Sequence, residues 1–503
     1  MPSDLRFLRS GSDVRGDACE FNGRPITLTP EIVAQIAYTF ALWLARKLDT
    51  TSDRLIIAVG RDPRITGEAL SAAVVRGLTA ADCDVLDCAL MTTPAMFYTT
   101  VDEATCAHGA LMITASHHPW YRNGLKFMTG QGGLTALEVT ALLDEAQHVT
   151  LPRRLVRDVD YLSVYSDRLA RLVRDQLDAE DDELPLLGLH VVVDAGNGSG
   201  GFYANLMQSL GADTTGSQFL DPNGMFPNHT PNPESPEAMR SVSRAVVEAK
   251  ADLGVIFDCD CDRAALVDAT GREINRNRLI ALISAILLEE KPGITIVTDS
   301  VTSSGLQQFI GEWGGVHYRF KRGYRNVIDE AMRLNDEGID CPIAIETSGH
   351  AALRENYFLD DGMYLVTRLI IEAVRRKRRG QTLGSLITEL REPVESLELR
   401  MQLSGPDFHA AGQAAIDRVL AAECDFWYPA ADNREGVRMV CGLEGGMDNA
   451  WFLLRLSLHD PVMPLNVESD IPGGVKLMLA TLLNILKGSE GLDLSLIEEA
   501  LAN

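Results

Sequence analysis

One pattern recurs along the chain and limits the folds that it can adopt. A short run of β-branched and other apolar residues ends at an acidic or small residue, a Gly/Ser/Pro loop follows, and then a helical stretch begins. The pattern occupies residues 54–70, 189–207 and 293–310, and its strand and loop appear again at 251–268. Short apolar runs that alternate with helices are typical of parallel β-α units with right-handed crossovers. Ligands bind such sheets at the loops beyond the carboxyl ends of the strands, so we expect the chemistry in these loops.

The length of the chain and its linkers predict several domains. A chain of 503 residues is too long for one hydrophobic core. Three segments look like linkers: the acidic DAEDDELPLLG, the short KPG, and the basic helix end RRKRRGQTLGSL, after which the β-α signals become fewer. We therefore expect domains at 1–187, 188–292, 293–392 and 393–503.

Composition narrows the classes of partner. The net charge of −25 argues against nucleic acid and anionic membranes, since both require a basic surface. A few basic side chains in one cleft can still bind a small anion. The nine cysteines include no CxxC pair, so neither a disulfide framework nor a structural zinc site is indicated. Without a signal-peptide core or a membrane-spanning apolar run, a cytoplasmic location is expected.

An aspartate-rich loop predicts a metal site. In FDCDCDRAALVD, Asp258, Asp260 and Asp262 alternate where a strand passes into a loop. If the chain leaves strand geometry there, the three carboxylates can converge on one cation, and hard oxygen ligands suit Mg²⁺. A solvated acidic loop is the alternative, which is disfavoured because like charges this close repel each other without a cation. No Gly-x₅-Glu continuation follows, so an EF-hand is excluded.

The segment TASHHP raises the question of a nucleophile. Ser116 follows a long apolar run. A serine before a proline is more often a turn residue, and a nucleophilic serine needs a base or a metal beside it. Each adjacent histidine, taken alone, is more often a packing or capping group than a general base. Asn123-Gly124 predicts a tight turn that would point Lys126 back toward this loop. No GxSxG elbow is present, so an α/β-hydrolase is not indicated.

The segment IAIETSGH offers candidate ligands for a sugar. Glu346, Ser348 and His350 follow another predicted strand. Such side chains can bind adjacent sugar hydroxyls, or they can form a capping arrangement, and the residues alone leave both interpretations open.

Candidate anion-binding groups occur in three places. In WFLLRLSLHDP, strand alternation would place Arg455, Ser457 and His459 on one face, which makes either a phosphate clasp or an ordinary amphipathic strand. Basic side chains beside glycines also suit anion binding, with surface charge as the alternative. These basic residues are Arg15, Lys321 and Arg325.

Taken together, these segments carry a resemblance. GSDVRG, TASHHPWYRNGLKF, DCDCDR, ETSGH and RLSLHDP stand in the order found in the α-D-phosphohexomutase superfamily. This superfamily includes phosphoglucomutases, phosphomannomutases and phosphoglucosamine mutases. The chain resembles it over nearly its whole length and is similar to a branch with plant plastid and bacterial members. The resemblance implies an α/β fold, with three related mixed or parallel α/β domains and a smaller C-terminal α+β domain around one central cleft.

The resemblance also implies an activity. Hexose 1-phosphate and hexose 6-phosphate, of glucose or mannose, would be interconverted through a phosphoserine at Ser116 and a 1,6-bisphosphate intermediate. Mg²⁺ would be bound by Ser116, Asp258, Asp260 and Asp262, and hexose 1,6-bisphosphate would act as activator. The partners would be sugar phosphates, and the protein a monomer or homodimer. A plastid location applies if the source is a plant or alga.

Roles for the remaining residues follow from the same resemblance. Arg15, Lys126 and His117 would serve catalysis near the serine. The substrate would be contacted by a larger set: Glu346, Ser348, His350, Lys321, Arg325, Arg263, Arg455, Ser457 and His459.

Several positions depart from the family pattern. Cys259 and Cys261 stand where most members have glycine, at a cost of about 1 kcal/mol for each one that needs a positive φ. Thr347 matches neither the methionine of glucose/mannose enzymes nor the glutamine of glucosamine enzymes, and SLHDP replaces the usual SGTEP. The alternatives are therefore a hexose 1,6-bisphosphate-forming enzyme, a phosphoglucosamine mutase, and a sugar-phosphate-binding protein without turnover.

Overall fold

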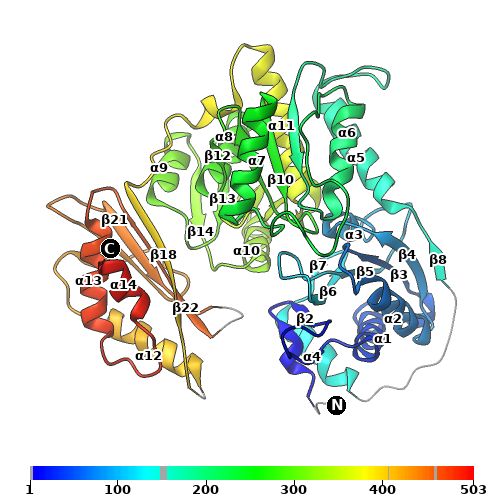
Figure 1. The fold of residues 1–503 in the computed structure, drawn as a ribbon, viewed down its shortest axis with the longest axis horizontal. Coiled ribbons are helices and arrows are strands. Elements are labelled where there is room, and N and C mark those ends of the chain that lie inside the picture. The colour runs from blue at the N-terminus through cyan, green and yellow to red at the C-terminus, as the bar shows by residue number, and fades with distance from the viewer. Residues whose placement is uncertain (1–3, 148–155, 406, 458–460, 503) are drawn as a thin grey trace. The chain divides into compact units, whose positions relative to one another are not determined.

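The structure is a computed structural model that describes residues 4–147, 156–405, 407–457 and 461–502. It comprises two compact units, each built from two stretches of the chain. The first unit contains Met1–Leu279 and Ser348–Ser385, and the second contains Ile280–Thr347 and Leu386–Asn503. Figure 1 follows the chain through the elements of both units.

A mixed sheet begins the first unit. Its strands run in the order β1-β2-β6-β5-β3-β4-β8, and β7 pairs with β6. Their bounds are β1 Arg9–Ser10, β2 Asp13–Asp17, β3 Ile56–Arg61, β4 Asp84–Leu90, β5 Gly109–Ile113, β6 Arg122–Thr129, β7 Gly132–Gly133 and β8 Val156–Asp158. Strand β3 pairs in parallel with β4 and β5, whereas β6 pairs antiparallel with β5 and β2.

Helices cover both faces of this sheet (Figure 1). They are α1 Pro30–Lys47, α2 Gly67–Ala80, α3 Thr93–Tyr98, α4 Ala136–Ala146 and α5 Tyr161–Gln176. Local sequence sets where they begin. The Thr29 hydroxyl accepts from the Ile32 N–H before Pro30 starts α1, and Thr135 forms a capping box with Glu138 at α4.

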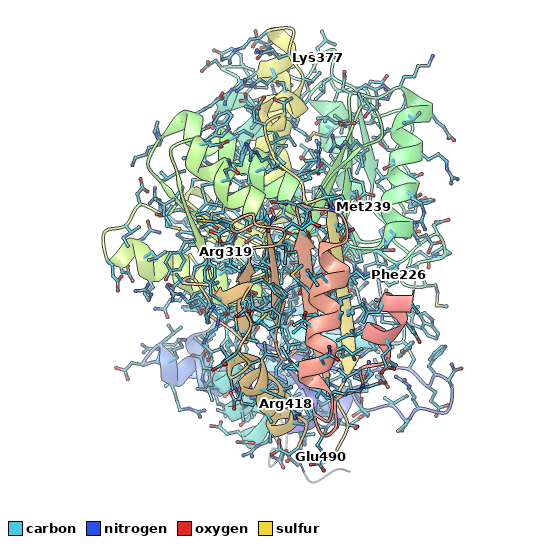
Figure 2. The ribbon with its side chains drawn as sticks, turned by 90° about the vertical axis from the view of Figure 1, so that its left-hand side faces the viewer. Phe226, Met239, Arg319, Lys377, Arg418 and Glu490 are labelled. Atoms are coloured by element: carbon cyan, nitrogen blue, oxygen red, sulfur yellow. The ribbon has the colours of Figure 1, made fainter. Side chains whose placement is uncertain are left out.

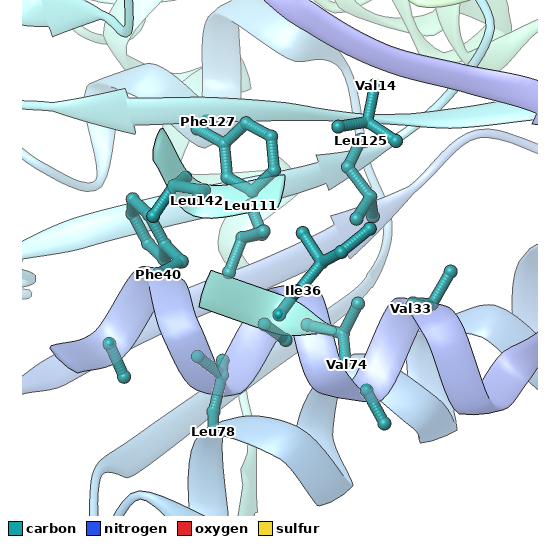
Figure 3. Close-up of a cluster of buried hydrophobic side chains, with 14 of the residues drawn as sticks. Val14, Val33, Ile36, Phe40, Val74, Leu78, Leu111, Leu125, Phe127 and Leu142 are labelled. Atoms are coloured by element: carbon teal, nitrogen blue, oxygen red, sulfur yellow. The ribbon is translucent and has the colours of Figure 1, made fainter. Parts of the chain in front are cut away.

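The largest core of the first unit lies between this sheet and helices α1, α2 and α4. Figure 3 shows Ile36 and Phe40 of α1 and Leu78 of α2 facing Leu111 of β5 and Phe127 of β6. Alternate residues of β5, such as Met112, are also buried but belong to the opposite face. Because both faces are covered, the central strands read as continuous apolar runs.

A second sheet of the first unit has the order β12-β11-β10-β9. Its strands are β9 Val191–Asp194, β10 Leu253–Phe257, β11 Ala264–Asp268 and β12 Glu273–Ile274. The accompanying elements are α6 Phe202–Ser209, α7 Pro236–Ala249, α11 Gly362–Arg378, β16 Ala351–Leu353 and β17 Leu359–Asp360. Strands β9 and β10 are parallel, but β10 and β11 are antiparallel. The aspartate-rich loop therefore connects two strands of a hairpin rather than a strand and a crossover helix.

The second unit contains a parallel and an antiparallel group of strands. The parallel group has the order β14-β13-β15. It comprises β13 Thr295–Thr298, β14 Val316–Arg319 and β15 Ile343–Ile345, with helices α9 Ser304–Glu312 and α10 Tyr324–Asp336. Helix α8, Asn277–Glu290, precedes it. Figure 2 labels Arg319 at the end of β14.

The antiparallel sheet has the order β18-β22-β21-β20-β19. It comprises β18 Glu395–Gln402, β19 Trp427–Pro429, β20 Val437–Cys441, β21 Ala450–Leu454 and β22 Val462–Ser469. Helices α12 Phe408–Leu420, which carries Arg418 of Figure 2, α13 Gly474–Leu486 and α14 Ser495–Ala502 accompany it. The expected α/β class with a further C-terminal α+β part is thus confirmed.

Most local expectations from the sequence are confirmed, and one is wrong. The three strand-loop-helix segments correspond to β3 and α2, β9 and α6, and β13 and α9. Asn123-Gly124 forms no tight turn, because both residues lie within β6. Strand β21 is assigned to end at Leu454, but the N–H groups of Arg455 and Ser457 donate to Pro464 O and Val462 O at 3.1 Å each, which continues the register of β21 with β22 and agrees with both side chains lying on one face. Among the described residues, no helix is long and apolar enough to cross a membrane.

Candidate active site

Three buried carboxylates converge in the loop between β10 and β11. Asp258, Asp260 and Asp262 are fully buried, and one oxygen of each lies within 4.8 Å of the others. Cys261 has a φ of 67°, which turns the chain out of strand geometry between the second and third carboxylate. Within the described chain, Asp260 Oδ1 and Asp262 Oδ1 are buried without a hydrogen-bond partner. Hard oxygen atoms that lack a donor fit a divalent cation such as Mg²⁺.

The electrostatics of these carboxylates also favour a cation. Burial, followed by the charges of its two neighbours, raises the pKa of Asp258 well above its usual range. Burial and the charge of Asp262 raise the pKa of Asp260 as well. Burial alone would raise the pKa of Asp262 too, but the positive charges of Lys126, His350 and Arg263 and the hydrogen bond from Lys126 together outweigh it, so that pKa is lowered. Positive charge in this loop therefore stabilises the ionised carboxylates.

The serine loop meets the carboxylate loop directly. Ser116 follows β5 with a φ of 53° and is only 1% exposed. Its Oγ donates to Asp258 Oδ2 at 3.1 Å and lies 3.3 Å from His117 Nδ1. Burial and nearby positive charges, chiefly Arg263, lower the pKa of His117 well below its usual value. Burial and these charges thus favour the neutral form of the imidazole.

Two basic side chains of the first unit, Lys126 and Arg15, act on this site in different ways. Lys126 Nζ lies 2.5 Å from Asp262 Oδ2 and 3.7 Å from Asp260 Oδ2. Lys126 therefore reaches the carboxylate loop from within a strand, without the turn that the sequence suggested. Arg15, on β2, pairs with Asp13 at 2.9 Å. Its charge also contributes to the lowered pKa of His117.

Arg263 and His350 form a second group of side chains beside the carboxylates. Arg263 Nε donates to His350 Nε2 at 2.9 Å, and the same Nε lies 3.9 Å from Asp258 Oδ2. His350 Nδ1 lies 2.6 Å from Asp360 Oδ2. Because Nε2 accepts from Arg263, a neutral His350 ring carries its proton on Nδ1, although Nδ1 and Asp360 Oδ2 do not meet in hydrogen-bonding geometry. Ser348 is buried in the same unit, in the segment that precedes β16.

The other predicted substrate residues belong to the second unit. Glu346 Oε1 accepts from Gly323 N at 2.5 Å. Arg455 follows β21 and is 5% exposed, and its Nε has no hydrogen-bond partner among the described residues. Burial and the charge of Arg322 lower the pKa of Arg455. A buried guanidinium with an unused donor suits an anion.

Three other predicted substrate residues of the second unit give less evidence of a binding site. Lys321 is exposed, and Arg325 pairs with Asp329 at 2.8 Å. The Ser457 N–H donates to Val462 O at 3.1 Å. The predicted phosphate ligand His459 lies outside the described residues.

Sequence reasoning missed three residues that support the site. Thr93 Oγ1 donates to Asp260 Oδ2 at 2.6 Å. Asp62 and Arg64, in the loop after β3, are fully and almost fully buried and contact the serine loop. The rule that sites form beyond the carboxyl ends of parallel strands could have indicated the β3 loop. Nothing local distinguishes Thr93 from a helix-start threonine.

Comparisons with known proteins agree with this geometry. The family descriptions "Phosphoglucomutase/phosphomannomutase, alpha/beta/alpha domain" I, II and III match residues 7–148, 164–271 and 275–394. The chain is 31% identical to a phosphomannomutase/phosphoglucomutase of Pseudomonas syringae, covering 86% of this chain and 87% of that one. It is also 31% identical to a phosphomannomutase of Salmonella montevideo, covering 83% and 88%.

A solved structure extends the likeness to three dimensions. The crystal structure of a phosphoglucomutase/phosphomannomutase family protein from Burkholderia thailandensis is 25% identical to the chain. It covers 96% of this chain and 98% of its own, with a TM-score of 0.79. The chain therefore belongs to the α-D-phosphohexomutase superfamily and is an isomerase of the phosphoglucomutase/phosphomannomutase type.

Proposed function

We propose that the chain interconverts hexose 1-phosphate and hexose 6-phosphate, with glucose or mannose as the sugar, through a phosphoryl group carried by Ser116. The observation that carries this proposal is the contact of Ser116 Oγ with Asp258 in a buried triad of carboxylates. A hydroxyl beside a site for a divalent cation is the arrangement that phosphoryl transfer requires. The names of the relatives support the choice of sugar phosphates.

Asp258, Asp260 and Asp262 would hold Mg²⁺ together with Ser116. When bound, Mg²⁺ supplies positive charge that offsets the nearly two negative charges of a phosphoserine. Arg15 and Lys126 add positive charge beside the serine loop and take part in proton transfer there. His117, whose Nδ1 lies 3.3 Å from Ser116 Oγ, is proposed as a further catalytic group beside the serine.

Two transfers complete the proposed reaction. The phosphoryl group of Ser116 passes to the free sugar hydroxyl, whose proton goes to a basic group of the site, and a hexose 1,6-bisphosphate results. The bisphosphate then reverses its orientation and returns its other phosphoryl group to Ser116, which leaves the isomeric monophosphate. Free hexose 1,6-bisphosphate would act as activator, because it phosphorylates Ser116 for the first turnover.

The remaining residues are proposed as substrate ligands. Glu346 and Ser348 would bind sugar hydroxyls, Arg263 and His350 the reacting end, and Lys321 and Arg325 the substrate's charge. Arg455, Ser457 and His459 would hold the phosphate that is not reacting. We also retain the division into domains at 1–187, 188–292, 293–392 and 393–503, which the matched family ranges support for the first three.

Phosphorus NMR tests this proposal. Glucose 1-phosphate is supplied with Mg²⁺ and a trace of glucose 1,6-bisphosphate, to wild type, Ser116→Ala and Ser71→Ala. Ser71 is a buried serine in α2, which makes its variant a matched control. We expect glucose 6-phosphate from wild type and Ser71→Ala only, and loss of activity with EDTA that added Mg²⁺ restores.

The other outcomes separate the alternatives. Bisphosphate that accumulates faster than glucose 6-phosphate would indicate a bisphosphate-forming enzyme. Turnover of glucosamine phosphate alone would indicate a phosphoglucosamine mutase. No turnover of glucose, mannose or glucosamine phosphates, with binding detected by calorimetry, would overturn the proposed isomerase in favour of a binding protein.

A further inference from the structure

The backbone of Ser116 is strained, and the structure shows what holds it. A φ of 53° places this serine in the left-handed region, which costs a residue with a side chain about 1–2 kcal/mol. Such strain persists only where the surroundings over-determine the conformation. The Ser116 N–H donates to Thr114 Oγ1 at 2.8 Å, and the Ser116 carbonyl accepts from Arg64 Nη2. The backbone of the serine is therefore fixed on both sides.

The two residues that bond to the backbone of Ser116, Thr114 and Arg64, both donate to the carboxylate of Asp62. Thr114 Oγ1 donates to Asp62 Oδ2 at 2.7 Å, and Arg64 Nε donates to the same oxygen at 3.0 Å. The side chains of Asp62 and Arg64 are both 0% exposed. Because a hydroxyl that donates to a carboxylate must use its lone pair to accept, Asp62 fixes Thr114 as the acceptor for the Ser116 N–H.

Arg64 also forms hydrogen bonds with carbonyl groups further along the serine loop. Its Nη2 donates to His118 O at 2.8 Å, and its Nη1 donates to Pro119 O at 2.8 Å and to Arg122 O at 3.0 Å. The ring of Phe226, labelled in Figure 2, lies 5.3 Å from the guanidinium carbon. A planar guanidinium with five donors can satisfy several carbonyls at once, which an ammonium cannot do in this arrangement.

The carboxylate loop is connected to the same group. Cys259 is fully buried, and its Sγ donates to Asp62 Oδ2 at 3.3 Å. The thiol sits in the loop that carries Asp258 and Asp260, while Asp62 belongs to the loop after β3. One carboxylate oxygen thus accepts hydrogen bonds from the serine loop, through Thr114, and from the carboxylate loop, through Cys259.

We propose that Asp62, acting through Thr114 and Arg64, is the positioning residue that holds Ser116 in its left-handed conformation, and that the Cys259 thiol aligns the carboxylate loop on the same group. This inference rests on the proposed function, because it assigns these residues to the placement of the phosphoryl-carrying serine. It gives Cys259 a role that glycine at this position could not fill, since glycine has no side-chain donor. This role does not require contact between the substrate and any of the four residues Asp62, Thr114, Arg64 and Cys259.

The test uses Thr114→Val, which removes one hydroxyl and keeps the shape. Thr114→Ser retains the hydroxyl and should restore most of the wild-type behaviour. Thr39→Val is the matched control, because Thr39 is equally buried in α1 and its hydroxyl bonds only within the helical core. The measurements are the rate at which glucose 1,6-bisphosphate phosphorylates Ser116, followed by intact mass, and amide hydrogen exchange of the segment 114–124.

We expect Thr114→Val to slow phosphorylation of Ser116 by about 10- to 100-fold, because an ångström of misplacement costs that much in rate. Amide exchange of the serine loop should become faster, and KM should change less than kcat. Cys259→Ala should produce faster exchange in the carboxylate loop, which Cys259→Ser and the matched control Cys88→Ala should not. Unchanged exchange and phosphorylation in Thr114→Val would overturn the positioning role of Asp62, and unchanged exchange in Cys259→Ala would overturn the role of the Cys259 thiol.

The readouts separate this inference from the proposed function. If wild type shows no isomerase activity but Thr114→Val still loosens the serine loop in hydrogen exchange, the proposed function fails and the positioning role stands. If wild type is active and Thr114→Val is indistinguishable from Thr39→Val, the positioning role fails and the proposed function stands.

Discussion

Single residues of the site combine strain with buried charge. Ser116 and Cys261 both adopt positive φ values, 53° and 67°, in the two loops that meet at the carboxylates. The suspicion that a cysteine occupies a glycine-like conformation is therefore confirmed for Cys261. It is wrong for Cys259, which is not among the residues with positive φ and whose side chain has a hydrogen-bonding role instead. Both strained residues lie where geometry matters more than local stability.

Replacing Lys126 should separate metal binding from catalysis. The Lys126 ammonium lies 2.5 Å from Asp262 Oδ2 and competes with a cation for the same carboxylates. Lys126→Met should bind Mg²⁺ about 10-fold more tightly, and it should lose about 100-fold in turnover because it removes the group that we propose for proton transfer. Calorimetric Mg²⁺ titration and the isomerase assay measure the two effects. Lys47→Met, which alters a surface pair with Glu138, is the control. Weaker Mg²⁺ binding in Lys126→Met would contradict this account.

A buried histidine should make stability depend on pH. His229 Nε2 lies 3.1 Å from both Asp194 oxygens, and Nδ1 lies 2.9 Å from Thr230 O. Burial alone would lower the pKa of His229, but the bond to Asp194 and its charge outweigh it, so the pKa is raised. The stabilisation is complete below the pKa of an unfolded histidine, about 6.5, and is lost as pH rises through the folded pKa.

His229→Gln tests this dependence. The difference in Tm between wild type and the variant should be largest below about pH 6.5 and should shrink as the pH rises from there through the raised folded pKa of His229. Replacing the solvent-accessible His409 by glutamine should give no such trend. A difference in Tm that grows with pH would show that His229 is held neutral.

At the scale of elements, the packing of helices depends on where glycine stands. A Cβ on Gly77 of α2 would lie 2.1 Å from the carbonyl oxygen of Ala34 in α1, so this glycine permits the close contact of the two helices. Gly311, in α9, has no atom within 4 Å of its would-be Cβ. The same substitution should therefore have opposite consequences at the two positions.

Gly77→Ala should destabilise the protein by about 1–3 kcal/mol, because the overpacked helices must separate. Gly311→Ala should instead stabilise it by about 0.5–1 kcal/mol, because alanine loses less backbone entropy in a helix. Thermal unfolding of the two variants beside wild type measures both shifts. A stabilising Gly77→Ala would mean that α1 and α2 separate without cost.

At the scale of the whole molecule, the chain passes between two units more than once. Each unit is assembled from two separate stretches of sequence, so its integrity depends on internal contacts rather than on chain continuity. In the second unit, Arg438 is 3% exposed and donates to Ser300 O at 2.7 Å and Thr302 O at 3.2 Å. Its guanidinium lies 3.7 Å from the centre of the Trp451 ring. This one side chain joins the strand β20 to the loop after β13.

Arg438→Met should therefore loosen the second unit selectively. The variant removes the Arg438 donor from the Ser300 carbonyl, at a cost of about 1–3 kcal/mol, whereas the Thr302 carbonyl still accepts from Arg319 Nε at 3.3 Å. Amide exchange should rise in 299–303 and in β20 and β21, while the core of α1 and β5 keeps its protection. Exchange that rises equally in both units would show that they unfold together. Arg418→Met, on the exposed face of α12, is the control.

Much of the fold was predictable because its signals are local. The apolar runs that became β3, β9, β10 and β13 are defined by neighbouring residues, as are the helix starts at Thr29 and Thr135. The antiparallel pairing of β10 with β11 was not predictable, because a strand followed by a loop reads the same whether the chain returns as a hairpin or through a helix.

The sequence by itself determined which chemical groups the candidate site contains, because the three aspartates, the loop serine and the basic side chains each stand in a short segment that its own neighbouring residues mark. Only the tertiary structure decided that Ser116 lies 3.1 Å from Asp258, a residue 142 positions away. It also decided that Asp62 and Arg64, ordinary surface residue types, are buried beneath the serine loop. The physical reason is that periodicity and turn chemistry act between neighbours, whereas burial of a charge depends on partners that folding brings from distant parts of the chain.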